Sequence, residues 1–133
     1  MEINEQKICL INPNLLVPLE NYNKDRVRWL EKKVLDDAKW LTAIAVSIEH
    51  NLVMDGHHRR QVAINLGLKL VPCLFFSYKD IKVRSLRDNE LVSPENIINK
   101  FRSNKEIYPY KTAKHELPDL GIIDPIKLID LQK

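Results

Sequence analysis

Hydrophobic and polar positions follow two periods along the chain, which predicts a mixture of strands and helices. Residues 7–11 form a short apolar run that ends at an Asn-Pro-Asn turn cluster, so a buried strand is expected there. From Asn23 the apolar residues recur at helical spacing, with charged residues on the opposite side. We expect the buried face of this helix to comprise Val27, Leu30, Val34, Leu35 and Ala38.

A hairpin followed by a second helix is predicted in the middle of the chain. Residues 42–54 read as two strands joined by a tight turn at 49–51. The next helix is expected to begin with Asp55 as its cap and to run to about Leu66, with Gly67 closing it just past the last periodic residue. Its buried face comprises Val62, Ala63 and Leu66.

The second half of the chain predicts two more strands and one more helix. Residues 70–77 are apolar enough for a central strand, and 80–85 alternate as an edge strand does. Ser93-Pro94-Glu95 is a typical helix start, with serine as cap and proline at the first helical position. Without repeats or a linker, residues 1–133 are expected to form a single α/β (α+β) domain, a small mixed sheet with packed helices.

Composition narrows the class of protein. The chain has 133 residues, 44% hydrophobic and 29% charged, and a net charge of +3, an excess too small to favour nucleic acid as a partner. No segment approaches the ~20 apolar residues of a membrane span, and the polar, acidic start does not resemble a signal peptide. We therefore expect a cytoplasmic protein without a membrane partner. Cys9 and Cys73 lie in apolar runs and are expected to be core residues.

The densest chemistry lies at residues 55–60, Asp-Gly-His-His-Arg-Arg, where a strand is predicted to lead into a helix. Exposed backbone N–H groups, the positive end of the helix dipole and two guanidinium groups together favour an anion such as phosphate. The alternative is an ordinary capped helix with solvated side chains. Zinc is disfavoured because adjacent side chains on a helix diverge by about a hundred degrees and the arginines would repel the ion.

Two further clusters suggest phosphoryl transfer when they are taken with this helix start. Glu20 is a single carboxylate in an apolar loop, and residues 111–115 form a basic Lys-Thr-Ala-Lys-His run. Phosphoryl transfer needs a phosphate cradle, a carboxylate for magnesium and a base or orienting group for the acceptor hydroxyl. Each cluster can also be read as a solvated loop. No Walker, Gly-x-Gly-x-x-Gly or protein-kinase pattern is present, so any nucleotide site must be built on the turn at Gly56.

The motif Asp55-Gly56-His57-His58-Arg59 closely resembles the signature of the ParB/sulfiredoxin-like fold, in the branch of free L-serine kinases and their relatives. In that branch a loop with a catalytic glutamate precedes the signature, and Val17-Pro18-Leu19-Glu20 occupies its place here. A later family segment, Pro-Pro-Lys-Thr-Thr-Arg-His, corresponds to residues 109–115. The order and spacing match from about Ile8 to Leu131, so the resemblance covers nearly the whole chain.

The resemblance implies a kinase that transfers a phosphoryl group from ADP or ATP, with Mg²⁺, to the hydroxyl of free serine or a similar amino acid. It assigns Glu20 as the base and Asp55 as the residue that serves the metal and the phosphates. The further residues that it assigns are Gly56, His57, His58 and Arg59 for the phosphates, Thr42 beside the nucleotide, and Lys111, Thr112 and His115 for the amino acid.

This chain departs from the family pattern where the acceptor would bind. Ala113 replaces a threonine, Lys114 an arginine, and Leu86 a tryptophan expected after the edge strand. The acceptor is therefore left open, as is the choice of nucleotide. Two alternatives also remain: a nucleotide-binding regulatory module that transfers no phosphate, and a ParB-like DNA-associated protein. Sulfiredoxin chemistry is not expected, because its cysteine position is held by His57.

Overall fold

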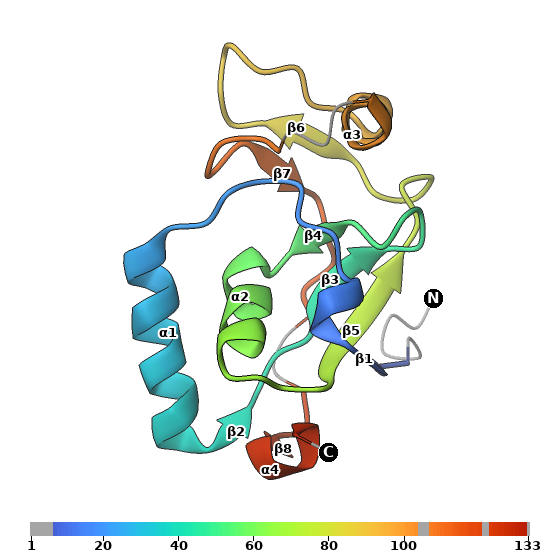
Figure 1. The fold of residues 1–133 in the computed structure, drawn as a ribbon. Coiled ribbons are helices and arrows are strands. Elements are labelled where there is room, and N and C mark those ends of the chain that lie inside the picture. The colour runs from blue at the N-terminus through green and yellow to red at the C-terminus, as the bar shows by residue number, and fades with distance from the viewer. Residues whose placement is uncertain (1–6, 104–106, 121–122, 133) are drawn as a thin grey trace.

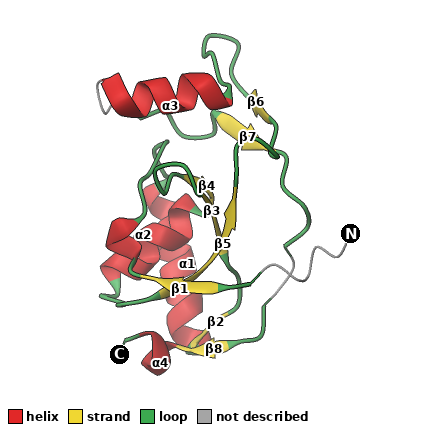
Figure 2. Ribbon diagram, turned by 90° about the vertical axis from the view of Figure 1, so that its right-hand side faces the viewer, coloured by secondary structure: helices red, strands yellow, loops and turns green. Residues whose placement is uncertain are grey.

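A four-stranded mixed sheet forms the centre of the molecule (Figures 1 and 2). The computed structural model describes residues 7–103, 107–120 and 123–132. In the sheet β3 and β5 are parallel, and the other two pairings are antiparallel. In spatial order the strands are β1 (Cys9–Ile11), β5 (Val71–Phe76), β3 (Ile44–Ser47) and β4 (Val53–Asp55). The expected combination of a small mixed sheet with packed helices is confirmed.

Two helices cover one side of this sheet, and the larger hydrophobic core lies between them and the strands. Helix α2 (His57–Asn65) lies next to the sheet, and α1 (Lys24–Asp37) packs on α2. A two-stranded sheet of β2 (Lys39–Trp40) and β8 (Ile126–Lys127), followed by the short α4 (Leu128–Leu131), closes the lower end. The largest fully buried side chains of this core include Trp40, Leu16, Ile44 and Leu131.

A second, smaller core lies at the other end of the main sheet. It is built around α3 (Pro94–Ser103) and an antiparallel pair of β6 (Val83–Ser85) and β7 (Ala113–His115). Its buried members include Leu19, Leu52, Met54, Tyr78, Ile97 and Tyr108. Figure 1 shows the segment before α1 passing beside β4 and β7, between the two cores.

Most predicted elements are confirmed together with their capping chemistry. Asn23 begins α1, because its side-chain oxygen accepts a hydrogen bond from the backbone N–H of Arg26 at 3.0 Å. Ser93 does the same for α3 through the N–H of Asn96. The hairpin of β3 and β4 forms as expected, and Gly67 follows α2 with φ +67°.

Several details differ from the sequence predictions. Asp55 does not cap α2: it is the last residue of β4, and Gly56 occupies the cap position without a side-chain hydrogen bond. Leu35 is 53% exposed, because α1 buries only the narrower stripe of Val27, Leu30 and Val34. Cys73 is buried as expected, whereas Cys9 on β1 is exposed.

No helix among the described residues is long and apolar enough to cross a membrane. The expectation that no signal peptide is present concerns residues 1–6, which lie outside the described residues.

Candidate functional site

The site is organised by the sharp turn that joins β4 to α2. Gly56 has φ +112°, a backbone conformation that residues with a side chain rarely adopt. A Cβ atom at this position would lie 3.2 Å from two side-chain carbons of Ile44, so space as well as backbone geometry requires glycine. The turn leaves Asp55 exposed at the end of β4 and starts α2 immediately at His57.

His57 is directed at the loop that carries Glu20. Its Nε2 accepts hydrogen bonds from the backbone N–H groups of Leu19, at 3.1 Å, and Glu20, at 3.4 Å. Burial, together with smaller electrostatic contributions from His115, Arg60 and His58, lowers the pKa of His57 to about 3. A neutral ring whose Nε2 accepts two backbone N–H groups fixes the position of the Glu20 loop.

His58 and Arg60 fix the neighbouring parts of the same segment. His58 Nε2 accepts from the backbone N–H of Asn23 at 3.0 Å, and burial together with nearby arginines lowers the pKa of His58. Arg60 Nε donates to the carbonyl oxygen of Leu16 at 3.0 Å. The first turn of α2 therefore holds the segment 16–23, a role that we did not anticipate from the sequence.

Glu20 is half-buried, and its carboxylate is positioned by the start of β7. Its Oε2 accepts from the backbone N–H groups of Thr112 at 2.9 Å and Ala113 at 3.1 Å. Burial raises the pKa of Glu20 above its usual value of 4.5 and outweighs the two hydrogen bonds and the charge of Arg87, which lower it. A carboxyl group in this environment accepts a proton more readily than a solvated one.

A cavity of about 460 Å³ brings several of the predicted residues together. Glu20, Asp55 and Arg59 line it, with Lys111 from the loop before β7 and Lys114 from β7 itself. The sequence did not identify its other cation, Arg26 of α1, or Trp29, which lines the cavity together with Tyr110 and with Leu86, the residue expected where the acceptor would bind. Four cations, Arg26, Arg59, Lys111 and Lys114, thus lie against two carboxylates, an arrangement that favours an anionic ligand.

A second cavity, of about 620 Å³, adjoins the first. The two share Asp55, Arg59 and Lys114, so these residues lie at the junction of the cavities. Of these two cavities, Thr42 and His115 line the second and not the first. Glu20 and His115 therefore face different cavities, and Asp55 belongs to both.

Thr112 is less accessible than its predicted role requires. Its side chain is fully buried and its hydroxyl donates to the carbonyl oxygen of Pro109 at 2.6 Å. It does not line either of the two cavities, and its contribution to the site is the backbone N–H that it donates to Glu20.

His115 is buried, and its Nε2 lies 2.9 Å from the hydroxyl of Tyr78. Burial lowers the pKa of His115 to about 4, with a further contribution from Lys114. Its Nδ1 has no hydrogen-bond partner among the described residues.

No group of three or more His, Cys, Asp or Glu side chains in the described part of the chain is arranged to hold a metal ion alone. Asp55 is an exposed carboxylate that lines both cavities together with Arg59 and Lys114. Magnesium typically uses one or two carboxylates and completes its coordination with water and phosphate oxygens. A metal held jointly by Asp55 and a bound phosphate fits this donor set.

Comparison with known proteins finds no matching family model. Among curated proteins, a ParB-like protein from Sulfolobus acidocaldarius is 28% identical over 61 residues. The match covers 46% of this chain and 31% of the length of that protein, so the chain spans less than a third of the relative that it matches.

Solved structures match over a much larger share of the chain. A free serine kinase in complex with AMP has a TM-score of 0.80 at 14% identity and covers 95% of this chain and 94% of its own. A C-terminally truncated SbnI from Staphylococcus aureus has a TM-score of 0.83 at 12% identity, covering 99% of this chain and 91% of its own. A mutant of the free serine kinase in complex with ADP has a TM-score of 0.71 at 15% identity, covering 93% of each chain. Likeness at this identity shows a shared fold.

Proposed function

We propose, from the premise that the chain has the ParB/sulfiredoxin-like fold, that it is a small-molecule kinase. The reaction is transfer of a phosphoryl group from a nucleotide to the hydroxyl of free serine or a serine-like amino acid. The observation that carries the proposal is the cavity in which Glu20, with its raised pKa, faces Asp55 and Arg59. The solved structures of similar fold that contain AMP and ADP support a nucleotide as the donor.

In this mechanism Glu20 is the general base. The acceptor hydroxyl loses its proton to the Glu20 carboxylate as its oxygen forms a bond to the terminal phosphorus of the nucleotide. The bond from that phosphorus to the bridging oxygen breaks, and the shortened nucleotide leaves with the electron pair. Arg59, Lys111 and Lys114 neutralise charge on the transferred group from the rim of the cavity.

Asp55 would hold the magnesium ion, because its exposed carboxylate lies where the two cavities meet. When it is bound there, the ion supplies positive charge to the phosphate oxygens. Gly56 allows the sharp turn by which the first N–H groups of α2 would face the phosphates beside Asp55.

The two histidines act in this proposal as positioning residues. His57 and His58 hold the backbone on both sides of Glu20 through neutral rings, so they maintain the base and contribute no positive charge to the phosphates. The loss of either would reduce turnover through displacement of Glu20.

We assign the larger cavity to the nucleotide and the smaller one to the acceptor. Thr42 and His115 border the larger cavity, whereas Glu20 and Lys111 border the smaller. Leu86 and Ala113 line the cavity that Glu20 faces, so the acceptor includes amino acids with a longer or more apolar side chain than serine. We place the reaction in the cytoplasm, where nucleotides and free amino acids are both available.

The test is to incubate the purified protein with Mg²⁺ and either ADP or ATP, offering serine, threonine or homoserine, and to follow phosphomonoester formation by ³¹P NMR. Glu20→Gln is expected to lower turnover by about 10²–10⁴-fold, the usual range for loss of a general base. The matched control is Glu95→Gln, which removes an exposed carboxylate in the first turn of α3 and should leave turnover unchanged.

Three outcomes distinguish the proposal from its alternatives. Nucleotide binding without product from any acceptor would indicate the regulatory module. Full turnover by Glu20→Gln would remove Glu20 as the base while leaving a kinase. Absence of both nucleotide binding and product would contradict the proposed function.

A further inference from the structure

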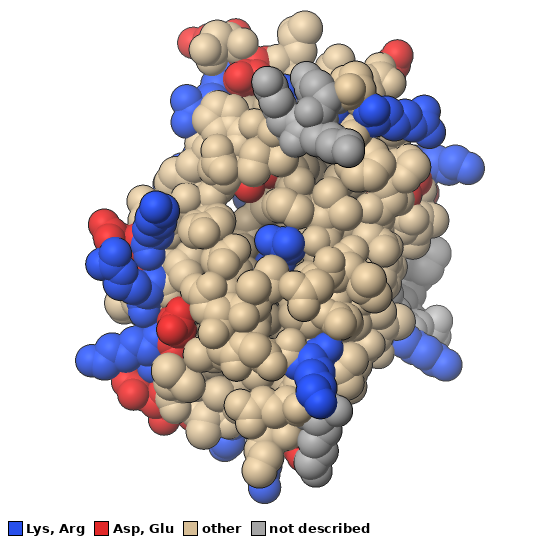
Figure 3. Space-filling view, viewed as in Figure 1, with Lys and Arg blue, Asp and Glu red and all other residues tan. Residues whose placement is uncertain are grey.

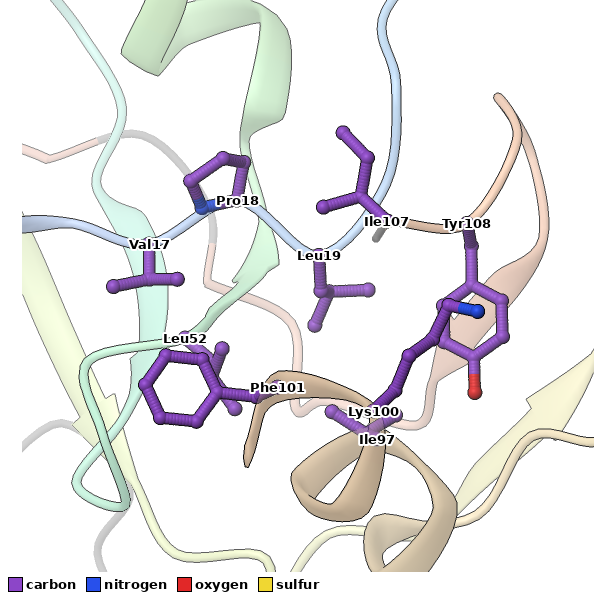
Figure 4. Close-up of a pocket in the computed structure, with 9 residues that line it drawn as sticks. All are labelled: Val17, Pro18, Leu19, Leu52, Ile97, Lys100, Phe101, Ile107 and Tyr108. Carbon is purple, nitrogen blue, oxygen red and sulfur yellow. The ribbon is translucent and has the colours of Figure 1, made fainter. Parts of the chain in front are cut away.

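A third cavity, here called the hollow, lies behind the loop that carries Glu20, and its lining is mostly apolar (Figure 4). Its volume is about 310 Å³, and aliphatic and aromatic side chains form nearly all of its wall. Val17, Pro18 and Leu19 provide one side, and Ile97 and Phe101 of α3 provide the opposite side. The hollow is concave, apolar and within the size range of small-molecule sites, ~300–1,000 Å³.

One cation lies at this apolar hollow. The ammonium of Lys100 is 4.9 Å from the centre of the Tyr108 ring, and Figure 4 shows the lysine side chain lying along that ring. No salt bridge joins Lys100 to an acidic side chain within the described ranges. A positive charge held beside apolar walls attracts an anionic group whose remaining part is apolar.

The hollow borders the segment that carries the proposed base. Leu19 lines it, and the next residue along the chain, Glu20, faces the acceptor cavity. Tyr108 also lines the hollow and pairs with this segment: its N–H donates to the carbonyl oxygen of Leu19, and its carbonyl oxygen accepts from the N–H of Asn21, both at 2.8 Å.

From these contacts we propose that the hollow binds a small apolar carboxylate. The aromatic or branched aliphatic body of the ligand fills the space between Leu52, Ile97 and Phe101, and its carboxylate pairs with Lys100. The single cation favours a monoanion over a phosphate ester, which would require several donors. A free small molecule suits the hollow better than a second copy of the chain, because it is a local depression and not an extended flat face.

Binding has a consequence for the Glu20 segment. A ligand in contact with Leu19 and Tyr108 stabilises the hydrogen bonds between residues 19–21 and Tyr108, and therefore the position of Glu20. An effect on turnover rests on the proposed function, whereas binding and backbone protection do not.

The experiment compares three probes of matched structure by isothermal titration calorimetry. Phenylacetate has the proposed apolar body and charge, phenylacetamide lacks the charge, and acetate lacks the apolar body. We expect phenylacetate to bind about tenfold more tightly than phenylacetamide, in line with the gain from one charge-assisted hydrogen bond, and acetate not to bind measurably.

Three variants locate the site. Lys100→Gln should remove the preference for the carboxylate, while Arg102→Gln, an exposed cation on the same helix, should retain it. Val17→Trp should fill the hollow from a half-buried position and abolish binding, with circular dichroism used to verify that the variant is folded. Hydrogen exchange of the Asn21 and Tyr108 amides should slow when phenylacetate is bound to the native protein.

Equal affinity for phenylacetate and phenylacetamide, or an unchanged preference in Lys100→Gln, would overturn the assignment of a carboxylate. Binding that persists in a folded Val17→Trp protein would place the ligand elsewhere. A native dimer that Val17→Trp dissociates would identify the hollow as an interface between two copies. Binding without slower amide exchange would overturn the proposed effect on the Glu20 segment. None of these readouts depends on phosphoryl transfer.

Discussion

Gly56 illustrates at the scale of a single residue how backbone and packing can impose the same requirement. Gly56→Ala would add a Cβ 3.2 Å from Ile44 at φ +112°. Gly67→Ala is the matched control, because it has φ +67° but no atom within 4 Å of the added Cβ. We expect Gly67→Ala to cost about 1 kcal/mol of unfolding free energy, from backbone strain alone, and Gly56→Ala to cost about 2–4 kcal/mol. Urea denaturation measures both, and equal losses would show that contact with Ile44 adds nothing.

The pKa values of two carboxyl groups are predicted to be shifted in opposite directions. Burial raises the pKa of Glu20 above 4.5. In Glu49 burial is outweighed by hydrogen bonds from the Ser77 hydroxyl and the Tyr78 backbone, so its pKa lies below 4.5. Titration of ¹³C-labelled side-chain carboxyls by NMR should place the Glu20 transition at higher pH than that of Glu49. The reverse order would contradict the environment described for both groups.

The raised pKa of Glu20 also predicts how kcat/KM decreases on the acid side of the pH profile. A general base works only when it is deprotonated, so kcat/KM should fall as pH decreases through a value above 4.5. Glu20→Asp should retain some turnover and move this limb, because the shorter carboxylate cannot keep both the hydrogen bonds and the reach of glutamate. If the pH at which kcat/KM falls is the same in Glu20→Asp as in the native protein, a group other than Glu20 is responsible for that fall.

The sequence identified the residues of the site better than it identified their individual roles. Glu20, Asp55 and Arg59 do line one cavity, as a shared site requires. The side chain of Thr112 is directed elsewhere, toward Pro109. The resemblance assigned His57 and His58 to the phosphates. The sequence does not reveal that a neutral imidazole will accept backbone N–H groups more than 30 positions away.

At the scale of elements, the first turn of α2 acts as a clamp on residues 16–23, and this clamp is sensitive to acid. His57, with a pKa of about 3, and His115, with about 4, both lie below the unfolded value of 6.5. As pH falls below 6.5 the unfolded chain takes up protons before the folded one, so folding stability decreases; above 6.5 both states are neutral and neither group matters. Each histidine changes the unfolding free energy by at most about 1.4 kcal/mol per pH unit.

His57→Gln tests this acid sensitivity, because the amide oxygen can accept from Leu19 but does not titrate. Between pH 6.5 and about 5, the unfolding free energy of the variant should fall less steeply with decreasing pH than that of the native protein. The difference should approach the slope that the uptake of one proton gives. Carboxyl contributions are common to both proteins and cancel in the comparison. Equal slopes in urea denaturation at several pH values would show that His57 is not buried as a neutral ring.

Elements defined by local pattern were predicted, and those defined by distant pairing were not. Helix α1, the β3–β4 hairpin and the start of α3 each have periodicity and a capping or turn residue within a few positions. Strand β7 is three residues long and exists through its pairing with β6, about 30 positions away. The opposition of Cys9 and Cys73 likewise follows from the β1–β5 register, which the sequence does not specify.

For the molecule as a whole, the candidate site lies at the boundary of two hydrophobic cores and belongs fully to neither. Met54 belongs to the smaller core, whereas Ile44, which constrains Gly56, belongs to the larger. The segment with Glu20 crosses between them and is held by α2 on one side and Tyr108 on the other. Displacement of one core relative to the other would therefore change the distance between Glu20 and Asp55.

The charges on one face of the molecule and those at the two cavities favour a small anion over duplex DNA. On the face shown in Figure 3 the lysines and arginines are separated, interspersed with acidic residues, and mostly at the edge. Arg59 and Lys114, by contrast, share the junction of two cavities that a duplex cannot enter. We expect Arg59→Gln to weaken ADP binding about tenfold, from loss of a charge-assisted contact, and Arg28→Gln, an exposed cation on α1, to leave it unchanged.

Binding measurements on the same two variants at several salt concentrations distinguish a nucleotide site from DNA binding. At physiological salt, duplex DNA should bind no more tightly than ~10⁻⁴ M, the weak limit of non-specific association. A protein with a net charge of only +3 is expected to neutralise few phosphates, so log K should change little with log salt concentration. A steep slope that both Arg59→Gln and Arg28→Gln reduce would instead indicate a broad phosphate-binding surface. It would support a ParB-like association with DNA at the expense of the nucleotide site.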